Sequence, residues 1–363
     1  MLHSSIVGGS TAKRVMACPA SVNLCAKMPP KPSSVHADRG TLLHDAIAML
    51  LDGKVERVIG MEYNGIILTQ ELYDDKIAVA LAALDEIDPD KRMEFAVESR
   101  VGFGDLLPGV FGSADLLGRI GNRAIVLDWK FGDGVVVDAV ENAQGMFYSA
   151  AAMRTPDTQW VFDGATEIEI IIVQPPMTRR WVTTPERIKQ FEAELVAAVK
   201  QSQKDDAAFN AGDHCRWCAA KPVCPKMTGE VDRFMKTSLQ TIDATQIGHY
   251  LQQADQIEDF IKSVREMAFT MLENDVPVSG YKLVAKRGTR QWANEDDAIK
   301  FLGDKAFESK LISVAQAEKL VGKKNFPQEL AVSVSSGNTL ANEDDPRPAI
   351  LNLSKVLSKL KVI

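Results

Sequence analysis

The spacing of apolar residues predicts amphipathic helices before a strand-rich centre. In the stretch GTLLHDAIAMLLDG, Leu43, Ile47 and Leu50 fall on one helix face, with Thr41 placed as the N-cap and Gly53 as the stop. The stretch DDKIAVALAALDEI has the same spacing and predicts a second helix. The proline- and serine-rich residues ahead of the first helix are typical of a loop.

From Met93 onward, short runs rich in β-branched and aromatic residues replace the helical spacing. The runs MEFAVESRVGF, VFGSADLLGRI and RAIVLDWKF are separated by glycine-containing breaks and predict three strands. Helical spacing returns in VENAQGMFYSAAAM, EIEIIIVQPP predicts a strand ended by its prolines, and a further helix is expected from Pro185 to Asn210. This order predicts an α/β fold with a central mixed sheet flanked by helices.

The last third of the chain predicts a mostly helical extension. Residues 240 to 275 form the longest periodic stretch and predict a long helix. GYKLVAKRGTRQW is typical of a basic strand or hairpin, SVSSGNTLANEDDPRP of a flexible linker, and LNLSKVLSKLKVI of a terminal amphipathic helix. We therefore expect a core domain at 1–230, a helical and basic accessory region at 231–332, and a linker with a terminal helix at 333–363.

Composition narrows the class of protein only slightly. The 363 residues are 45% hydrophobic and 25% charged, as in an ordinary globular protein. With neither a run long enough to cross a bilayer nor an apolar signal core, the chain is expected to stay in the cytoplasm, away from membranes. A net charge of −7 argues against nonspecific coating of nucleic acid but permits a local DNA groove.

Two carboxylates and a lysine are predicted to meet on a β-hairpin. Gly121 and Asn122 suit a two-residue turn between the second and third predicted strands. If Ile120 pairs with Arg123, the antiparallel register places Asp115 opposite Asp128, at roughly 5 Å between Cβ atoms. Lys130, two residues further on, projects from the same face.

This arrangement is typical of a phosphodiester-cleaving site. Like charges that lie opposite each other destabilise a hairpin unless a cation compensates them. Hard oxygen ligands suit Mg²⁺ or Mn²⁺, which polarises a phosphate and lowers the pKa of a bound water. A nearby lysine can orient that water or stabilise negative charge in the transition state. A lone D-x-K pattern also occurs by chance in ordinary strands.

Several motifs around this hairpin resemble those of the RecB-like branch of the PD-(D/E)XK nucleases over about residues 10 to 230. The matching segments are GTLLHDA with His44, GSAD with Asp115, LDWK with Asp128 and Lys130, and AQGMFY with Gln144 and Tyr148. The resemblance implies a restriction-endonuclease-like core in which His44, Asp115 and Asp128 bind the metal together with the Trp129 carbonyl. It also implies that Gln144 and Tyr148 position the catalytic lysine or the DNA backbone.

Each of these residues also has an ordinary structural interpretation. His44 alone would more often be a packing histidine than a ligand. Gln144 and Tyr148 are four residues apart, so they share a helix face and could form the polar edge of a packed helix. Glu98, in the first predicted strand, is either a further acid of the site or part of a structural salt bridge.

The five cysteines predict a second metal site. CRWCAAKPVC gives the spacing Cys215-x2-Cys218-x5-Cys224, and with no second C-x-x-C pair the fourth ligand must come from elsewhere. RVMACPAS resembles the N-terminal segment of iron–sulfur RecB-like nucleases, which implies Cys18, with Cys25 and then His214 as alternatives. Four thiolates suit either [4Fe–4S] or Zn²⁺. The resemblance favours an iron–sulfur cluster that staples the fold.

The expected function is a metal-dependent DNA nuclease, in first place an exonuclease. The resemblance implies a phage or prophage enzyme for DNA recombination, replication or end processing in the bacterial cytoplasm, acting on DNA ends or single-stranded regions with little sequence specificity. Expected partners are a single-strand-binding or annealing protein, or a helicase on a separate chain, since GGSTAKR lacks the ending of an ATPase phosphate loop. The rivals are a zinc-stapled structure-specific endonuclease and a catalytically silent DNA-binding or assembly module.

Two basic segments are candidates for contact with DNA. Arg216, Lys221 and Lys226 surround the cysteines, and Trp217 either stacks on an unpaired base or packs within a solvated rim. A second basic run begins at Lys282 and continues to Arg290. Neither segment resembles a motif that reads bases, so sequence-specific cleavage is not expected.

Overall fold

The computed structural model describes residues 4–29, 33–132, 135–229, 244–284, 313–322, 327, 330 and 331. The chain divides into two units, Met1–Val284 and Ala285–Ile363. Within the second unit, the described helix is α11 (Val314–Val321). The predicted linker and terminal helix, and the part of the second basic run that follows residue 284, lie outside the described residues.

A five-stranded sheet in the order β3-β4-β5-β6-β7 forms the centre of the first unit. Its strands are β3 (Glu94–Gly102), β4 (Phe111–Ile120), β5 (Arg123–Trp129), β6 (Glu167–Gln174) and β7 (Met177–Thr183). Strands β5 and β6 are parallel and the other neighbours antiparallel, which confirms the predicted mixed sheet.

Strand β7 is an element that the sequence interpretation did not include. The prolines of EIEIIIVQPP end β6 as predicted, since Gln174 is its last residue and Pro175 and Pro176 follow it. Gln174 pairs with Met177, and the chain returns antiparallel to β6 as the edge strand β7. The prolines fit because they occupy the turn, where no ladder hydrogen bond is needed.

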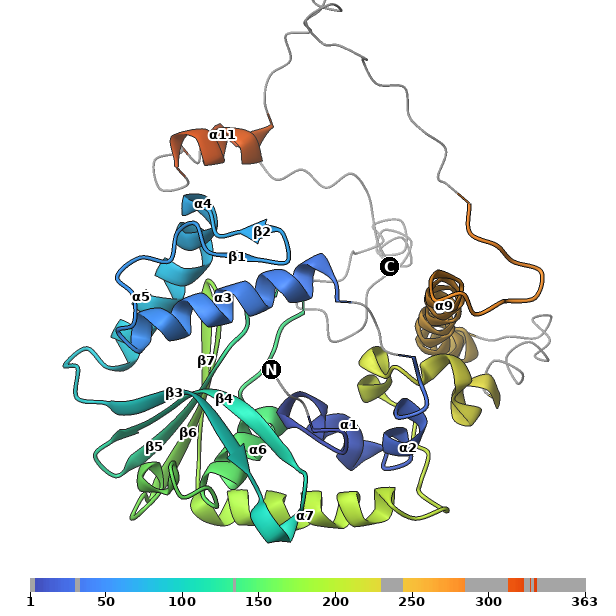
Figure 1. The fold of residues 1–363 in the computed structure, drawn as a ribbon, viewed down its shortest axis with the longest axis horizontal. Coiled ribbons are helices and arrows are strands. Elements are labelled where there is room, and N and C mark those ends of the chain that lie inside the picture. The colour runs from blue at the N-terminus through green and yellow to red at the C-terminus, as the bar shows by residue number, and fades with distance from the viewer. Residues whose placement is uncertain are drawn as a thin grey trace, which may run out of the picture. The chain divides into compact units, whose positions relative to one another are not determined.

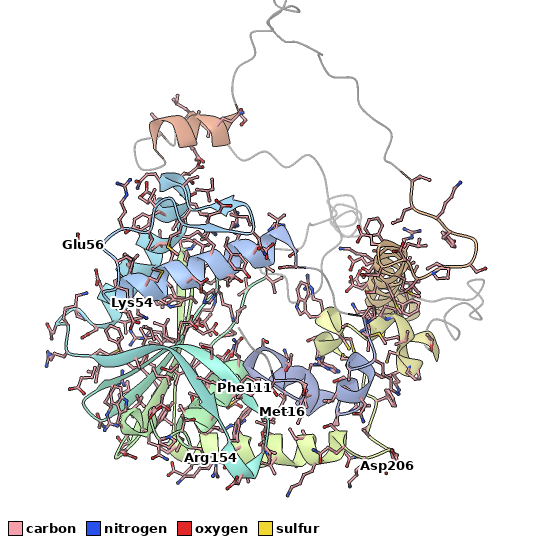
Figure 2. All side chains as sticks on the ribbon, in the orientation of Figure 1. Met16, Lys54, Glu56, Phe111, Arg154 and Asp206 are labelled. Atoms are coloured by element: carbon pink, nitrogen blue, oxygen red, sulfur yellow. The ribbon has the colours of Figure 1, made fainter. Side chains whose placement is uncertain are left out.

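Helices cover both faces of the sheet (Figure 1). One face packs against α1 (Ala12–Ala17), α6 (Ala143–Ala152) and α7 (Pro185–Ser202), and the other against α3 (Val35–Leu51) and α5 (Val79–Ile87). The side chains between sheet and helices form two separate apolar cores, one on each face (Figure 2). The fold is therefore a helix–sheet–helix sandwich, as the sequence predicts.

Shorter elements connect these layers. They are η1 (Gly9–Thr11), α2 (Ser21–Cys25), β1 (Glu62–Tyr63), β2 (Ile66–Ile67), α4 (Gln70–Leu72), η2 (Tyr73–Ala78), η3 (Gly104–Leu106), η4 (Gln159–Val161), η5 (Asp213–Trp217) and η6 (Lys221–Val223). The predicted long helix is α9 (Ala244–Glu273), which packs against η6. In the described part of the chain, none of the helices combines the length and apolar character that a membrane span requires.

Helix α3 begins earlier than predicted. Its N-cap is Ser34, whose side chain accepts a hydrogen bond from the Ala37 amide, and not Thr41. Thr41 instead lies inside the helix, where its hydroxyl donates to the Ala37 carbonyl. The predicted apolar face is confirmed, since Leu43 and Ile47 are buried against the sheet. The earlier start places His44 in the middle of a helix rather than in its first turn.

The predicted hairpin register is confirmed. Ile120 pairs with Arg123, and the ladder between β4 and β5 continues to the pair Leu116 and Leu127. Gly121 in the turn has φ of 57°, in the left-handed region that glycine adopts readily. Asp115 and Asp128 are therefore the next residues in register.

Candidate active site

Backbone pairing between strands β4 and β5 ends just before Asp115 and Asp128. The last backbone pair is Leu116 with Leu127, and beyond it the Trp129 amide donates a hydrogen bond of 2.7 Å to Asp115 Oδ2. A side-chain oxygen thus accepts the hydrogen bond of a β5 amide. This contact fixes the orientation of the Asp115 carboxylate at the point where the strands open.

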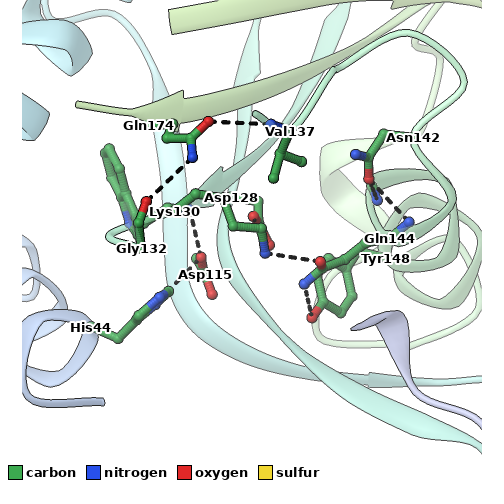
Figure 3. Close-up of polar contacts among 12 residues, drawn as sticks. His44, Asp115, Asp128, Lys130, Gly132, Val137, Asn142, Gln144, Tyr148 and Gln174 are labelled. Carbon is green, nitrogen blue, oxygen red and sulfur yellow. Dashed lines mark hydrogen bonds and ion pairs between the residues drawn. The ribbon is translucent and has the colours of Figure 1, made fainter. Parts of the chain in front are cut away.

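The Asp115 carboxylate also lies close to helix α3. His44 of α3 points toward it (Figure 3), with Nδ1 3.5 Å from Asp115 Oδ2. His44, Glu98 and Asp115 each offer one ligand atom, and these three atoms lie within 4.8 Å of one another. In the described part of the chain, this is the one group of three or more His, Cys, Asp or Glu side chains that meets this criterion.

Glu98 belongs to the site through an unusual backbone conformation. It lies on β3 between Val97, which pairs with Leu116, and Ser99, which pairs with Ala114. Its φ of 46° is in the left-handed region, which costs a residue with a side chain of this size conformational energy. Its carboxylate accepts a hydrogen bond of 2.9 Å from the Ser113 hydroxyl. Of the two interpretations, the structure favours a further acid of the site over a salt bridge.

Lys130 connects Asp128 to helix α6. Its Nζ lies 2.7 Å from Asp128 Oδ2 and donates a hydrogen bond of 2.9 Å to Gln144 Oε1. Gln144 Nε2 in turn donates to the Tyr148 hydroxyl at 3.0 Å (Figure 3). The structure thus joins four of the predicted residues in one chain of polar contacts.

Helix α6 is held in a fixed position that serves this chain of contacts. The Asn142 side chain caps its first turn by accepting from the Gln144 and Gly145 amides. A Cβ at Gly145 would meet Ile170 Cγ2 at 2.5 Å, so the helix lies close against β6 only because this residue is glycine. The Tyr148 ring is confined in the same way, since a Cβ at Gly9 would meet it at 2.6 Å.

Burial and like charges act together on the acids of the site. Burial, followed by the charge of Asp115, raises the pKa of Glu98. Burial also raises the pKa of Asp128, which is 1% exposed, although the Lys130 ammonium opposes this effect. Both carboxylates therefore hold a proton more readily than an exposed acid does.

The pKa values of the basic groups of the site are raised as well. Burial lowers the pKa of Lys130, but the negative charge of nearby Asp128 outweighs burial and raises the pKa overall. The pKa of His44 behaves in the same way, with Asp115 as the main opposing influence. Burial raises the pKa of Tyr148, so its hydroxyl keeps its proton at neutral pH.

The side chains present suit a hard divalent cation. Carboxylate oxygens and an imidazole nitrogen are ligands that Mg²⁺ and Mn²⁺ accept. Asp128 Oδ2 is buried, and although Lys130 is near, no donor among the described residues meets it with hydrogen-bond geometry. A buried oxygen without a properly aligned donor is a position that a cation would satisfy.

The segment after Lys130 is fastened by a residue that sequence analysis missed. Gln174, at the end of β6, donates from Nε2 to the carbonyls of Gly132 and Val135 and accepts from the Val137 amide (Figure 3). Strands β5 and β6 are parallel, so their carboxyl ends meet at one edge of the sheet. The signal available in the sequence was a polar residue at the end of a strand that runs parallel to the strand carrying Asp128.

The predicted cysteine ligands gather at one place. Cys18, Cys215, Cys218 and Cys224 line a single pocket together with His214, and Cys25 Sγ lies 3.7 Å from Cys218 Sγ. All the candidate ligands, from two segments far apart in the sequence, therefore meet here. In the described residues, no three of them bring their ligand atoms within the 4.8 Å that His44, Glu98 and Asp115 reach.

The sulfurs of Cys25 and Cys218 lie 3.7 Å apart, within hydrogen-bonding distance. The hydrogen bond from Cys218 lowers the pKa of Cys25 to about 6, and the same contact raises the pKa of Cys218. Burial raises the pKa of Cys215. Cys25 is thus ionised more readily than an exposed thiol, and the ionised state is the one a metal ligand needs. Cys18 is the more deeply buried of the two alternatives. The geometry leaves both open as the fourth ligand.

Comparison with known proteins places the chain in a family. Residues 3–348 match the model of the family described as "Protein of unknown function (DUF2800)". A solved structure described as "Crystal structure of SSO0001" is similar at 13% sequence identity over 60% of this chain and 85% of that chain, with a TM-score of 0.27. At that TM-score the likeness carries no argument.

Proposed function

The chain belongs to the DUF2800 family, and from the geometry of its carboxylate site we propose that it is a Mg²⁺- or Mn²⁺-dependent deoxyribonuclease of the RecB-like PD-(D/E)XK type. The finer fold assignment, a restriction-endonuclease-like core, is part of the same proposal. We further propose that it acts as an exonuclease on DNA ends in phage recombination, replication or end processing.

One observation carries the proposal. A buried aspartate, a lysine, a glutamine and a tyrosine form a continuous polar chain beside the group His44, Glu98 and Asp115. A structural salt bridge has no need of two carboxylates, Glu98 and Asp115, at so short a separation, because their mutual repulsion costs stability. A site for a divalent cation needs such carboxylates.

His44, Glu98, Asp115 and Asp128 would hold the cation. When bound, the cation polarises the scissile phosphate and lowers the pKa of an attacking water. The Trp129 carbonyl stays a predicted further ligand. The amide of the same residue orients Asp115 through their 2.7 Å hydrogen bond.

Lys130 supplies a fixed positive charge next to the phosphate. Asp128 raises its pKa, so Nζ keeps its proton and stabilises negative charge that develops on the phosphate oxygens. Gln144 Oε1 accepts from Nζ and holds it in place. Tyr148 accepts from Gln144 Nε2 and thereby fixes which end of the amide faces the lysine. Gln144 and Tyr148 act through Lys130 as positioning residues.

The cysteine pocket would hold a [4Fe–4S] cluster, with Zn²⁺ as the alternative. Cys215, Cys218 and Cys224 with Cys18 or Cys25 supply the thiolates, and sulfur ligands suit both. Its proposed role is to join the N-terminal segment to the segment after α7. The partners proposed from the sequence are a single-strand-binding or annealing protein, or a helicase on another chain.

Purified protein with linear and circular DNA tests the proposal. We expect linear DNA to be degraded with Mg²⁺ or Mn²⁺ and to survive with EDTA, while circular DNA persists. The variant Asp128→Asn should lose cleavage, and Asp85→Asn, at an exposed acid, should keep it. Cleavage of circular DNA would favour the structure-specific endonuclease instead. Binding without any cleavage would favour the silent module and refute the proposed activity.

A further inference from the structure

Trp217 is the most exposed of the four tryptophans that the structure describes. It is 76% exposed, whereas Trp160 is 37% and Trp129 is 1% exposed. The alternative interpretation, in which Trp217 packs within a solvated rim, is therefore wrong. A large flat aromatic left in water is unfavourable by itself, and exposed aromatic surface of this kind marks a binding site more often than other exposed side chains do.

The turn that carries Trp217 is held rigidly. Trp217 lies in the C-x-x-C turn, where the Cys218 amide donates to the Cys215 carbonyl at 3.1 Å. The Lys221 side chain is 4% exposed, and its Nζ donates to the Arg216 carbonyl at 3.2 Å and to Asp259 of α9 at 3.4 Å. The aromatic ring thus lies on a turn that these hydrogen bonds hold in place, so little conformational entropy is lost when a ligand contacts it.

Cationic side chains accompany the ring. The Arg216 guanidinium carbon lies 5.4 Å from the centroid of the Trp217 ring, in a cation–π contact. Lys226, on the same segment, is also exposed. The surroundings of Trp217 therefore carry exposed positive charge in a chain whose net charge is −7.

Aromatic surface with adjacent cations fits single-stranded DNA. An unpaired base presents a flat face that stacks on an aromatic ring, while its phosphates pair with arginine and lysine. Double-stranded DNA hides those faces within its stack and would use only the cations. A protein partner with an apolar surface would use the ring but not the cations.

We infer that Arg216 and Trp217 form a platform on which an unpaired base of a single DNA strand stacks. This inference rests on the proposed function in that it takes DNA as the substrate, and it specifies a single-stranded region as the form recognised. Helix α1 packs against both η5 and α6. It therefore connects the platform to the helix that carries Gln144.

Binding of a fluorescein-labelled (dT)20 strand to the full chain, without added Mg²⁺ or Mn²⁺, tests the inference. Trp217→Ala should weaken binding about 10-fold or more, since one base–aromatic stack has a large effect on affinity. Trp217→Phe, which keeps an aromatic face, should recover most of it. Arg216→Gln should lower the slope of log affinity against log salt by about 0.7. Trp160→Ala is the matched control at another exposed tryptophan and should bind like wild type.

The outcomes are separable from those of the nuclease test, because binding is measured without cleavage. Equal affinity of wild type and Trp217→Ala for (dT)20 would overturn the inference even if the protein degrades DNA. So would an equal loss of affinity for a hairpin duplex, since that would indicate a general effect and not stacking. If Trp217→Ala changed the oligomeric state alone, the ring would serve contact between copies and the inference would fail. If (dT)20 binding depends on Trp217 but the wild type cleaves no DNA, the result would support the stacking platform and refute the proposed nuclease activity.

Discussion

Asp128 is a carboxylate held in the interior of the protein, where ionisation is costly. It is 1% exposed, and burial raises its pKa. Lys130, 2.7 Å away with a side chain that is 26% exposed, is the cation that offsets this cost. Neither residue is independent of the other, because removing one leaves the remaining charge buried without a partner.

Lys130→Met should abolish most cleavage while the protein stays folded. The variant removes the only lysine ammonium in contact with Asp128 and Gln144 among the described residues, and loss of one such charge-stabilising group costs about 100- to 1,000-fold in rate. Asp128 can respond by taking up a proton, so the fold should survive with lower stability. The measurement is the rate of linear-DNA loss in Mn²⁺, with Lys91→Met at an exposed ion pair as the control. Activity within threefold of wild type would exclude Lys130 from the reaction.

Glu98→Gln should stabilise the metal-free protein at neutral pH. Burial and the charge of Asp115 raise the pKa of Glu98 in the folded state. The folded wild type therefore loses stability as the pH rises from the unfolded glutamate pKa of about 4.3 through the folded pKa. Below about pH 4.3 the carboxyl is protonated in both states, so this loss of stability is absent. Glutamine avoids the loss and can still accept from Ser113.

Melting temperatures across pH 4 to 8 measure this effect. The gain should be largest at high pH and vanish on acidification, and the rise in melting temperature that Mn²⁺ gives the wild type should shrink in the variant. Glu94→Gln, at an exposed residue of the same strand, is the control. A destabilised Glu98→Gln that keeps its full response to Mn²⁺ would show that Glu98 is structural.

The sequence predicted the residues on the hairpin better than it predicted Glu98. Gly121 and Asn122 fix a two-residue turn, and the register of Asp115 and Asp128 follows from counting outward from it. Glu98 reaches the site through the pairing of β3 with β4 across residues 103–110 and through its own φ of 46°. Neither feature has a local signal in the sequence, so its role stayed open until the strands were seen side by side.

At the scale of elements, the contact between α6 and β6 sets the position of the whole polar chain. Gly145 lets the helix approach Ile170, and the same helix carries Gln144 and Tyr148 toward Lys130. A small outward movement of α6 would lengthen the hydrogen bond from Lys130 to Gln144. The packing of one glycine is therefore coupled to the geometry of the site.

Gly145→Ala should destabilise the fold and slow cleavage together. The new Cβ would lie 2.5 Å from Ile170 Cγ2, and such overpacking costs about 1–3 kcal/mol, more than the helix gains from alanine. Gly40→Ala in α3 is the matched control, because nothing lies within 4 Å of its Cβ position, and it should stabilise by about 0.5–1 kcal/mol.

Urea unfolding and DNA-cleavage rates measure both effects of the Gly145 change. Ile170→Ala removes the atoms that the new Cβ would meet, so the double variant should be more stable than the two single losses together imply. Strict additivity of the two changes would show that α6 does not depend on this contact.

Element boundaries were less predictable than element types. The sequence predicted α3 but not its start, because the proline- and serine-rich residues before it were taken as loop while Ser34 supplies the cap. It predicted β6 and its end at Pro175 and Pro176, but not that the chain turns back there and pairs with β6 as β7. In both cases the deciding feature was a cap or a pairing partner, which propensity alone does not reveal.

At the scale of the first unit, protein–protein hydrogen bonds join the N-terminal segment to the end of α7 and the segment after it. The Ala20 amide donates to the Ala208 carbonyl, the Asn23 side chain to the Ser202 carbonyl, and the Asn210 side chain to the Ala17 carbonyl. These bonds hold together the two segments that carry the cysteines. The resemblance to iron–sulfur RecB-like nucleases implied this closure, but the hydrogen bonds had no signal of their own.

Cysteine variants test whether a metal completes this closure. Cys25 and Cys218 are 193 residues apart in sequence, and in the chain-entropy treatment a link across so long a loop contributes on the order of 5 kcal/mol. The protein–protein hydrogen bonds already constrain part of that loop, so the loss on removing the metal should be smaller. We expect Cys215→Ser, and one of Cys18→Ser and Cys25→Ser, to lose bound iron or zinc and to melt at lower temperature.

Anaerobic purification, metal analysis and melting temperature decide the assignment. Ser21→Ala, at a residue that lines the same pocket without a thiol, should keep its metal. Whichever of the two N-terminal variants loses the metal identifies the fourth ligand, and the visible spectrum distinguishes iron–sulfur from zinc. Because cleavage is assigned to residues on β4, β5 and α6, loss of activity should follow loss of stability in these variants and be absent at temperatures where they remain folded. If the wild-type protein contained neither iron nor zinc, the proposed metal staple would be refuted, whereas the proposal for the carboxylate site would be unaffected.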